Sequence, residues 1–158
     1  MSRALVFLAV LALGLPAGAA ATATDIGDGT LSIKDGRGSF TIAARGGIIG
    51  TFARGSVVIT DPVADDGTGP IVSGDDWPPV YRNETTTVYG GTRVRFRLIG
   101  GRFRIKVQGT GVNLSLVGKG QITLNGKGTG DDGTYSVNGE SPIPVPDIWQ
   151  FLLSSTSP

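Results

Sequence analysis

The sequence predicts an all-β protein, built as an antiparallel sandwich or a small closed barrel of about eight to ten short strands. Apolar and polar residues alternate in short runs, as at Phe103, Ile105 and Val107. This period of two places one face of a strand in the core. Glycine occurs 26 times and recurs between these runs, which is typical of strands joined by turns. No stretch keeps a helical period, apart from a single turn near the C-terminus.

The first 23 residues have the organisation of a secretory signal peptide. After a basic start, an apolar run covers residues 4–15 and ends at Pro16. Ala21-Thr22-Ala23 suits the signal peptidase, with Ala17-Gly18-Ala19 as an alternative, so we expect the mature chain to begin at Thr24. A membrane-spanning helix needs about 20 apolar residues, and this run is too short. We therefore expect a secreted or cell-envelope protein with no transmembrane segment in its mature chain.

The composition disfavours several classes of function. The chain has 14 basic and 13 acidic residues, and one basic residue leaves with the signal peptide. A mature chain without net charge is not a uniformly basic nucleic-acid-binding protein. The chain also lacks cysteine and histidine, so disulfides, Ser-His-Asp triads, Cys-His dyads and zinc or haem sites built on those ligands cannot form. We expect no enzymatic activity, no cofactor and no bound metal.

Ten strands are predicted, each bounded by glycine or other turn-forming residues. They cover residues 30–34, 39–45, 48–53, 56–60, 86–89, 93–99, 102–108, 112–117, 121–125 and 134–137. The predicted core consists of the apolar residues that alternate within them: Leu31, Ile33, Phe40, Ile42, Val94, Phe96, Leu98, Phe103, Ile105, Val107, Leu114 and Leu116.

The mature chain, residues 24–158, is predicted to be a single domain with an internal duplication. Residues 38–46 align with residues 101–109, and glycine, phenylalanine, isoleucine and glycine coincide. This predicts two four-stranded units, residues 24–60 and 86–140, joined by an acidic, Pro- and Gly-rich connection at 61–85. A Pro-rich tail follows at 141–158. We expect its apolar part, residues 148–153, to dock on the core as a last strand or a short turn.

The strongest functional feature is a predicted basic hairpin around Gly100-Gly101. Two glycines suit a two-residue hairpin turn, which would place Leu98 opposite Phe103 and Arg97 opposite Arg104. One hairpin face would be apolar, and the other would carry six cations: Arg93, Arg95, Arg97, Arg102, Arg104 and Lys106. Like charges directly opposed on neighbouring strands destabilise a sheet by roughly 0.2–1 kcal/mol per pair. The predicted face therefore calls for neutralising anions.

Two sources of these anions are open. An external polymer, such as an acidic polysaccharide or an anionic envelope polymer, would make the face a binding surface. No aromatic residue lies among the cations on which a nucleic-acid base could stack, so single-stranded nucleic acid is not favoured as a ligand. Sequence-specific nucleic-acid binding is not expected either. Alternatively, the five acidic residues from Asp61 to Asp76 neutralise the face internally, and the protein is a structural or protein-interaction module of the cell envelope.

Acidic residues also suggest two further kinds of site. Asp65-Asp66-Gly67 and Asp131-Asp132-Gly133 carry oxygen ligands that suit calcium, but their spacing differs from that of the EF-hand loop. Asp-Gly is a common turn former, so we interpret both as turns. Asp75 and Asp76 beside Trp77 would suit a glycosidase cleft, which needs two carboxyl groups about 5–10 Å apart. A carbohydrate-active enzyme is therefore a third and less favoured hypothesis.

Three stretches, residues 29–40, 48–57 and 96–105, resemble a type of small secreted Gly-rich β protein from high-GC Gram-positive bacteria. The resemblance covers most of the mature chain, but it lies in strands and turns and contains no chemical motif. It implies export and a β fold, and it carries over no activity and no site residues.

Overall fold

The computed structural model describes residues 26–63, 67, 69–74 and 79–157; the predicted signal peptide lies outside them. Within these residues every regular element is a strand, which confirms the all-β prediction. No helix in this part of the chain is long and apolar enough to span a membrane. The strands are β1 (Gly29–Thr60), β2 (Ile71–Ser73), β3 (Val80–Asn83), β4 (Thr86–Leu98), β5 (Arg102–Gly126), β6 (Thr134–Val137), β7 (Ile143–Pro144) and β8 (Trp149–Leu153).

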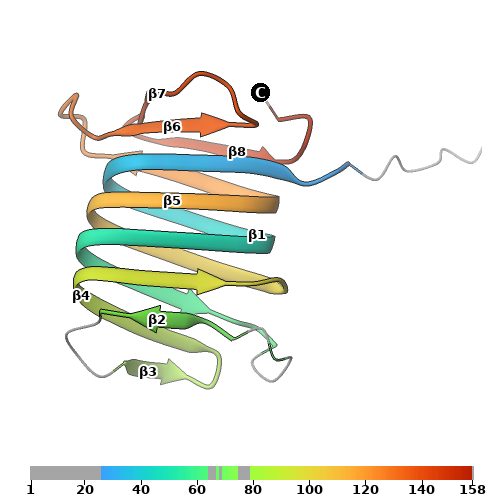
Figure 1. Ribbon diagram of the computed structural model, residues 1–158, viewed down its shortest axis with the longest axis vertical. Coiled ribbons are helices and arrows are strands. Elements are labelled where there is room, and N and C mark those ends of the chain that lie inside the picture. Colours follow the sequence, from blue (N-terminus) through green and yellow to red (C-terminus); the bar gives the residue numbers. More distant parts are fainter. Residues whose placement is uncertain (1–25, 64–66, 68, 75–78, 158) are drawn as a thin grey trace, which may run out of the picture.

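The long strands β1 and β5 wind together as antiparallel neighbours, and Figure 1 shows them as the stacked turns of a flattened coil. Gly29 and Gly46 both pair with Gly118, so one turn of β1 takes 17 residues and a pass of β5 lies between successive turns. For the same reason, residues 39–45 pair with residues 102–108 on one side and with residues 119–125 on the other. Each long strand therefore passes alternately through two layers.

The two flat sides of the coil form a sandwich-like pair of layers, and the sheet does not close on itself. The structure thus decides between the two predicted architectures. Layer 1 contains, in order, β7, β6, residues 30–36 of β1, 110–117 of β5, 47–54 of β1, 92–98 of β4, and β2. Layer 2 contains β8, residues 119–125 of β5, 39–45 of β1, 102–108 of β5, 56–60 of β1, 86–90 of β4, and β3.

The core lies between the layers, and all twelve residues predicted for it are buried. Phe96 points inward from layer 1, and Phe40 points inward from layer 2. Because the apolar residues of each pass alternate with polar ones, the same pass also presents a hydrophilic row to solvent. The alternation therefore determines the inner and outer face of every strand.

Glycines stand where the chain bends from one layer into the other. At Gly46 φ is 144°, a value that residues with a side chain rarely adopt. A Cβ atom there would lie 2.2 Å from the carbonyl oxygen of Val117. Along one edge of the coil the successive cross-strand neighbours are Gly126, Gly38, Gly109, Gly55 and Gly91. Along the other edge they are Gly29, Gly118 and Gly46, and the Gly46 amide donates to the Gly101 carbonyl oxygen. Close backbone packing therefore excludes side chains at these glycine positions.

These bends differ from the turns that the sequence suggested. The predicted strands at 30–34, 39–45, 48–53 and 56–60 are successive passes of one strand, β1. The two predicted units also do not form separate layers, because passes of β1 alternate with passes of β4 and β5 in both layers. Residues 38–46 and 101–109, which the proposed duplication aligns, lie side by side as antiparallel neighbours in layer 2.

The C-terminal tail closes one end of the coil. Strand β8 pairs with residues 120–124 of β5, so of the two predicted alternatives for the tail, a strand or a short turn, the strand is correct. The ring of Trp149 stacks on Phe151 at 4.4 Å between centroids and contacts Tyr135 at 5.4 Å. The side chain of Asn138 accepts a hydrogen bond from the Thr30 amide and donates to the Ser154 carbonyl oxygen. These hydrogen bonds connect the beginning of β1 with the residues that follow β8.

Candidate anion-binding surface

The predicted basic hairpin is wrong. Leu98 of β4 pairs with Ile48, and Arg102 of β5 pairs with Arg45, so both strands take β1 as their neighbour. Among the described strands no pairing joins β4 to β5. Gly100 and Gly101 do have positive φ, at 83° and 76°, but they carry the chain from layer 1 into layer 2. The physical reason is that β1 offers an edge in each layer, and each of the two strands forms its hydrogen bonds there.

The six predicted site residues are consequently divided. Arg95 and Arg97 lie on the outer face of layer 1, where they pair with Thr51 and Ile49. Arg93 has φ 55° and follows the bend at the edge of the coil. The remaining three point outward from one pass of β5 in layer 2: Arg102, Arg104 and Lys106. The side chains of all six residues are exposed.

Layer 2 adds two cations that sequence reasoning missed. Arg45 is the direct cross-strand partner of both Arg102 and Lys119. Three cations on three adjacent passes, one of β1 between two of β5, therefore stand in one line, with neighbouring Cα atoms about 5 Å apart. The Lys119 ammonium also donates to the Ile26 carbonyl oxygen at 3.4 Å. We call Arg45, Arg102, Arg104, Lys106 and Lys119 the basic face. No local signal marks Arg45 or Lys119, because only strand pairing brings them into line with Arg102.

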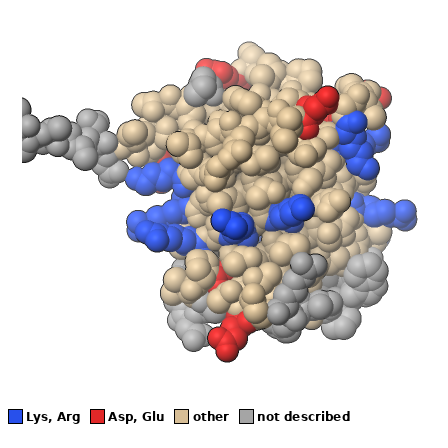
Figure 2. All heavy atoms as spheres, turned by 180° about the vertical axis from the view of Figure 1, so that it is seen from behind, with Lys and Arg blue, Asp and Glu red and all other residues tan. Residues whose placement is uncertain are grey.

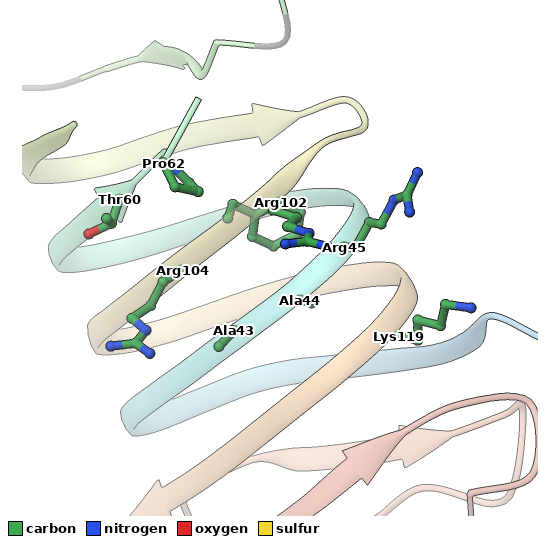
Figure 3. A pocket seen from close by; sticks show the side chains of 9 residues that line it. Ala43, Ala44, Arg45, Thr60, Pro62, Arg102, Arg104 and Lys119 are labelled. Carbon is green, nitrogen blue, oxygen red and sulfur yellow. The ribbon is translucent and has the colours of Figure 1, made fainter. Parts of the chain in front are cut away.

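A hollow of about 450 Å³ lies within the basic face. Its origin is the short side chains of Ala43 and Thr60, the two cross-strand partners of Arg104. Figure 3 shows Ala43 between Arg104 on one side and Arg45 and Lys119 on the other. Of the described residues that line the hollow, none is acidic: they are Ala43, Ala44, Arg45, Thr60, Pro62, Arg102, Phe103, Arg104 and Lys119. The arrangement offers several cations to a ligand over a small, largely apolar floor.

Charge is segregated on this side of the molecule. Figure 2 shows the side that faces away in Figure 1, where Lys and Arg form a band across the middle and most of the visible acidic surface lies above and below this band. Asp65, Asp66, Asp75 and Asp76, together with Trp77, lie outside the described residues. Neutralisation of the cations by this loop and the glycosidase cleft therefore stay predictions.

Asp132, one of the candidate calcium ligands, organises a turn. It is 3% exposed, and its carboxylate accepts hydrogen bonds from the Lys127 amide at 2.6 Å and the Thr129 hydroxyl at 2.9 Å. Burial alone would raise the pKa of Asp132, but the hydrogen bonds from Thr129, Lys127 and Gly128 together lower it. No group of three acidic side chains suited to a metal ion occurs among the residues the structure describes. Asp132 therefore acts here as a turn residue.

Comparison with known proteins identifies no relative: no family model, curated protein or solved structure matches this chain. The functional argument therefore depends on the chemistry of the basic face. Guanidinium groups form two parallel hydrogen bonds with carboxylate, sulfate or phosphate oxygens, and three of the five cations are arginines. The face is thus suited to oxyanions.

Proposed function

We propose that the mature protein is a secreted or envelope-associated, non-enzymatic β domain that binds an anionic extracellular polymer through the basic face. The observation that carries the proposal is the line of Lys119, Arg45 and Arg102 across three adjacent passes of β5 and β1. Opposed like charges destabilise a sheet. The strand does not need cations at its outward positions, because the outward position of β1 next to Arg45 is Ala43. A bound polyanion offsets this repulsion, because each cation is attracted to the anionic groups of the polymer.

The chemistry of the face favours an acidic polysaccharide or a phosphate polymer. The basic face is open, and its cations are spread over three adjacent passes of β1 and β5. It can therefore contact several charged groups along a ligand. Among the described residues that line the hollow, Phe103 is the one aromatic, and its side chain is buried in the core. The described residues of this hollow therefore offer no stacking platform of the kind that single-stranded nucleic acids use. Binding of this kind weakens as salt screens the charges.

The proposal is tested by retention on immobilised heparin at low salt. The triple variant Arg45→Gln, Arg102→Gln, Arg104→Gln should bind about a hundredfold more weakly, because each cation near an anionic surface contributes about 1 kcal/mol, or about fivefold in affinity. The matched control is Lys34→Gln, Arg95→Gln, Arg97→Gln, which removes the same charge from the outer face of layer 1. This control should retain wild-type affinity. Equal losses in the two variants would show that net charge, not this face, determines binding.

The competing hypothesis is a structural or protein-interaction module whose cations are neutralised within the chain. It predicts that the intact protein is not retained on heparin. It also predicts that retention appears when the four central acidic residues of the 61–85 connection are replaced by asparagine: Asp65, Asp66, Asp75 and Asp76. Retention of the unmodified protein, lost in the basic-face variant alone, excludes this hypothesis.

A further inference from the structure

We infer that the bound polymer is linear and lies along the strands of layer 2, from one glycine edge of the coil to the other; this rests on the proposed function. The outward residues of the central β5 pass are Arg102, Arg104, Lys106 and Gln108. Successive outward residues of a strand are about 6.8 Å apart. The cations of β5 therefore form a row parallel to the strand, and charge is repeated along it.

Three hollows follow this row and share residues. The first, of about 450 Å³, shares Thr60 and Arg104 with the second, which has about 360 Å³. The second shares Gln108 with the third, which has about 330 Å³ and includes Lys127. The three hollows therefore form one continuous groove, which we call the track. It begins at Lys119, Arg45 and Arg102 and ends at Lys127.

Short side chains on both flanking strands leave room for the track. Its flanks are formed by the cross-strand neighbours of Arg104, Lys106 and Gln108. In that order these neighbours are Ala43, Thr41 and Ser39 on one side, and Thr60, Val58 and Ser56 on the other. The long cationic side chains thus stand above a floor of small residues. A polymer chain can lie beside the row and contact successive cations without displacing any side chain.

The far end of the track crosses a glycine edge. Gly38, Gly109 and Gly126 are cross-strand neighbours, and all three line the third hollow. A Cβ atom on Gly38 would lie 2.1 Å from the Asn125 carbonyl oxygen, so the close packing of the edge keeps it free of side chains. From Arg102 to Gly109 the strand extends about 24 Å. An open track of this length suits a chain, whereas a compact anion needs donors that converge on one point.

The inference is tested with heparin-derived di-, tetra-, hexa- and octasaccharides, titrated calorimetrically at low salt. Affinity should rise at least tenfold from the disaccharide to the octasaccharide, and it should level off once the ligand spans the track. Lys127→Gln should weaken octasaccharide binding about fivefold and leave disaccharide binding unchanged, because Lys127 lies at the far end. Arg97→Gln, on the opposite layer, should alter neither.

The titrations distinguish failure of the proposed function from failure of the linear track. If the wild-type protein binds none of the oligosaccharides and is not retained on heparin, the proposed function itself fails. If it binds the disaccharide as tightly as the octasaccharide, or if Lys127→Gln has no effect at any length, binding is real but the linear track is wrong. Polyphosphate titrated against orthophosphate repeats the length test for a phosphate polymer. Equally tight binding of single-stranded DNA would overturn the assignment to a polymer recognised without base stacking.

Discussion

At the scale of single residues, Gly50 shows how a missing side chain shapes the core. It is a buried residue of β1 and pairs directly with Phe96 of β4. A Cβ atom on Gly50 would lie 2.2 Å from Cζ of the Phe96 ring. The glycine is therefore required by the volume of its neighbour, and the aromatic ring fills the space that the glycine leaves.

Gly50→Ala should destabilise the protein by about 1–3 kcal/mol, the usual effect of overpacking a core. The free energy of unfolding from urea titration measures this effect. Gly47→Ala is the matched control in the same strand, because among the described residues a Cβ atom there meets only the Leu98 carbonyl oxygen, at 3.7 Å. The control should change stability by no more than about 0.5 kcal/mol. Similar effects of the two substitutions would contradict the packing argument.

Asp132 gives a prediction on pH. Its pKa in the folded protein is lowered from the ordinary value of 3.8, so its carboxylate stabilises the fold above that value. The stabilisation is lost as the pH falls through the lower, folded-state pKa. Asp132→Asn should therefore be less stable than the wild type at neutral pH, and the difference should shrink below about pH 3.8. Thermal unfolding across this range measures it, with the exposed Asp131→Asn as control. A difference that is constant with pH would refute the role of the ionised carboxylate.

At the scale of elements, the coil places residues from distant passes directly opposite one another. Arg45 ends a pass of β1 beside the bend at Gly46, and Arg102 begins a pass of β5 beside the bend at Gly101. Both bends lie on the same edge of the coil, so the two guanidinium groups are brought onto neighbouring strands. The repulsive pair expected in the hairpin, Arg97 with Arg104, is thus replaced by the pair of Arg45 with Arg102.

Arg45→Gln should stabilise the fold and weaken polymer binding. Removing the opposed like charges should raise the free energy of unfolding by about 0.2–1 kcal/mol, while heparin affinity falls about fivefold. Urea titration and heparin chromatography measure the two quantities. Gln121→Ala, at an exposed position across from Ala43, should change heparin affinity little. A loss of stability in Arg45→Gln would instead indicate an internal anionic partner and favour the structural module.

At the scale of the whole molecule, the coil separates two outer faces of different chemistry. The outer face of layer 2 carries the basic face and its hollows. The outer face of layer 1 also carries cations, Lys34, Arg95 and Arg97, but there they stand among hydroxyl-bearing residues such as Ser32 and exposed aliphatic residues such as Ile49. Because each long strand passes through both layers, consecutive passes along the chain alternate between the faces. A surface of one kind is therefore assembled from segments that are far apart in the sequence.

By itself, the sequence determined the fold class, the twelve predicted core residues and the passes of the long strands. These features follow from local alternation, which reports the inner and outer face of each strand. It could not determine which passes are neighbours, because alternation has the same period in every strand and contains no information on pairing. The Gly100-Gly101 pair is an example, since positive φ suits a hairpin and a bend between layers equally. Only the tertiary structure decided that Arg45 and Lys119, not Arg95 and Arg97, join Arg102 on one face, because hydrogen bonding to distant passes of the chain selects the neighbours.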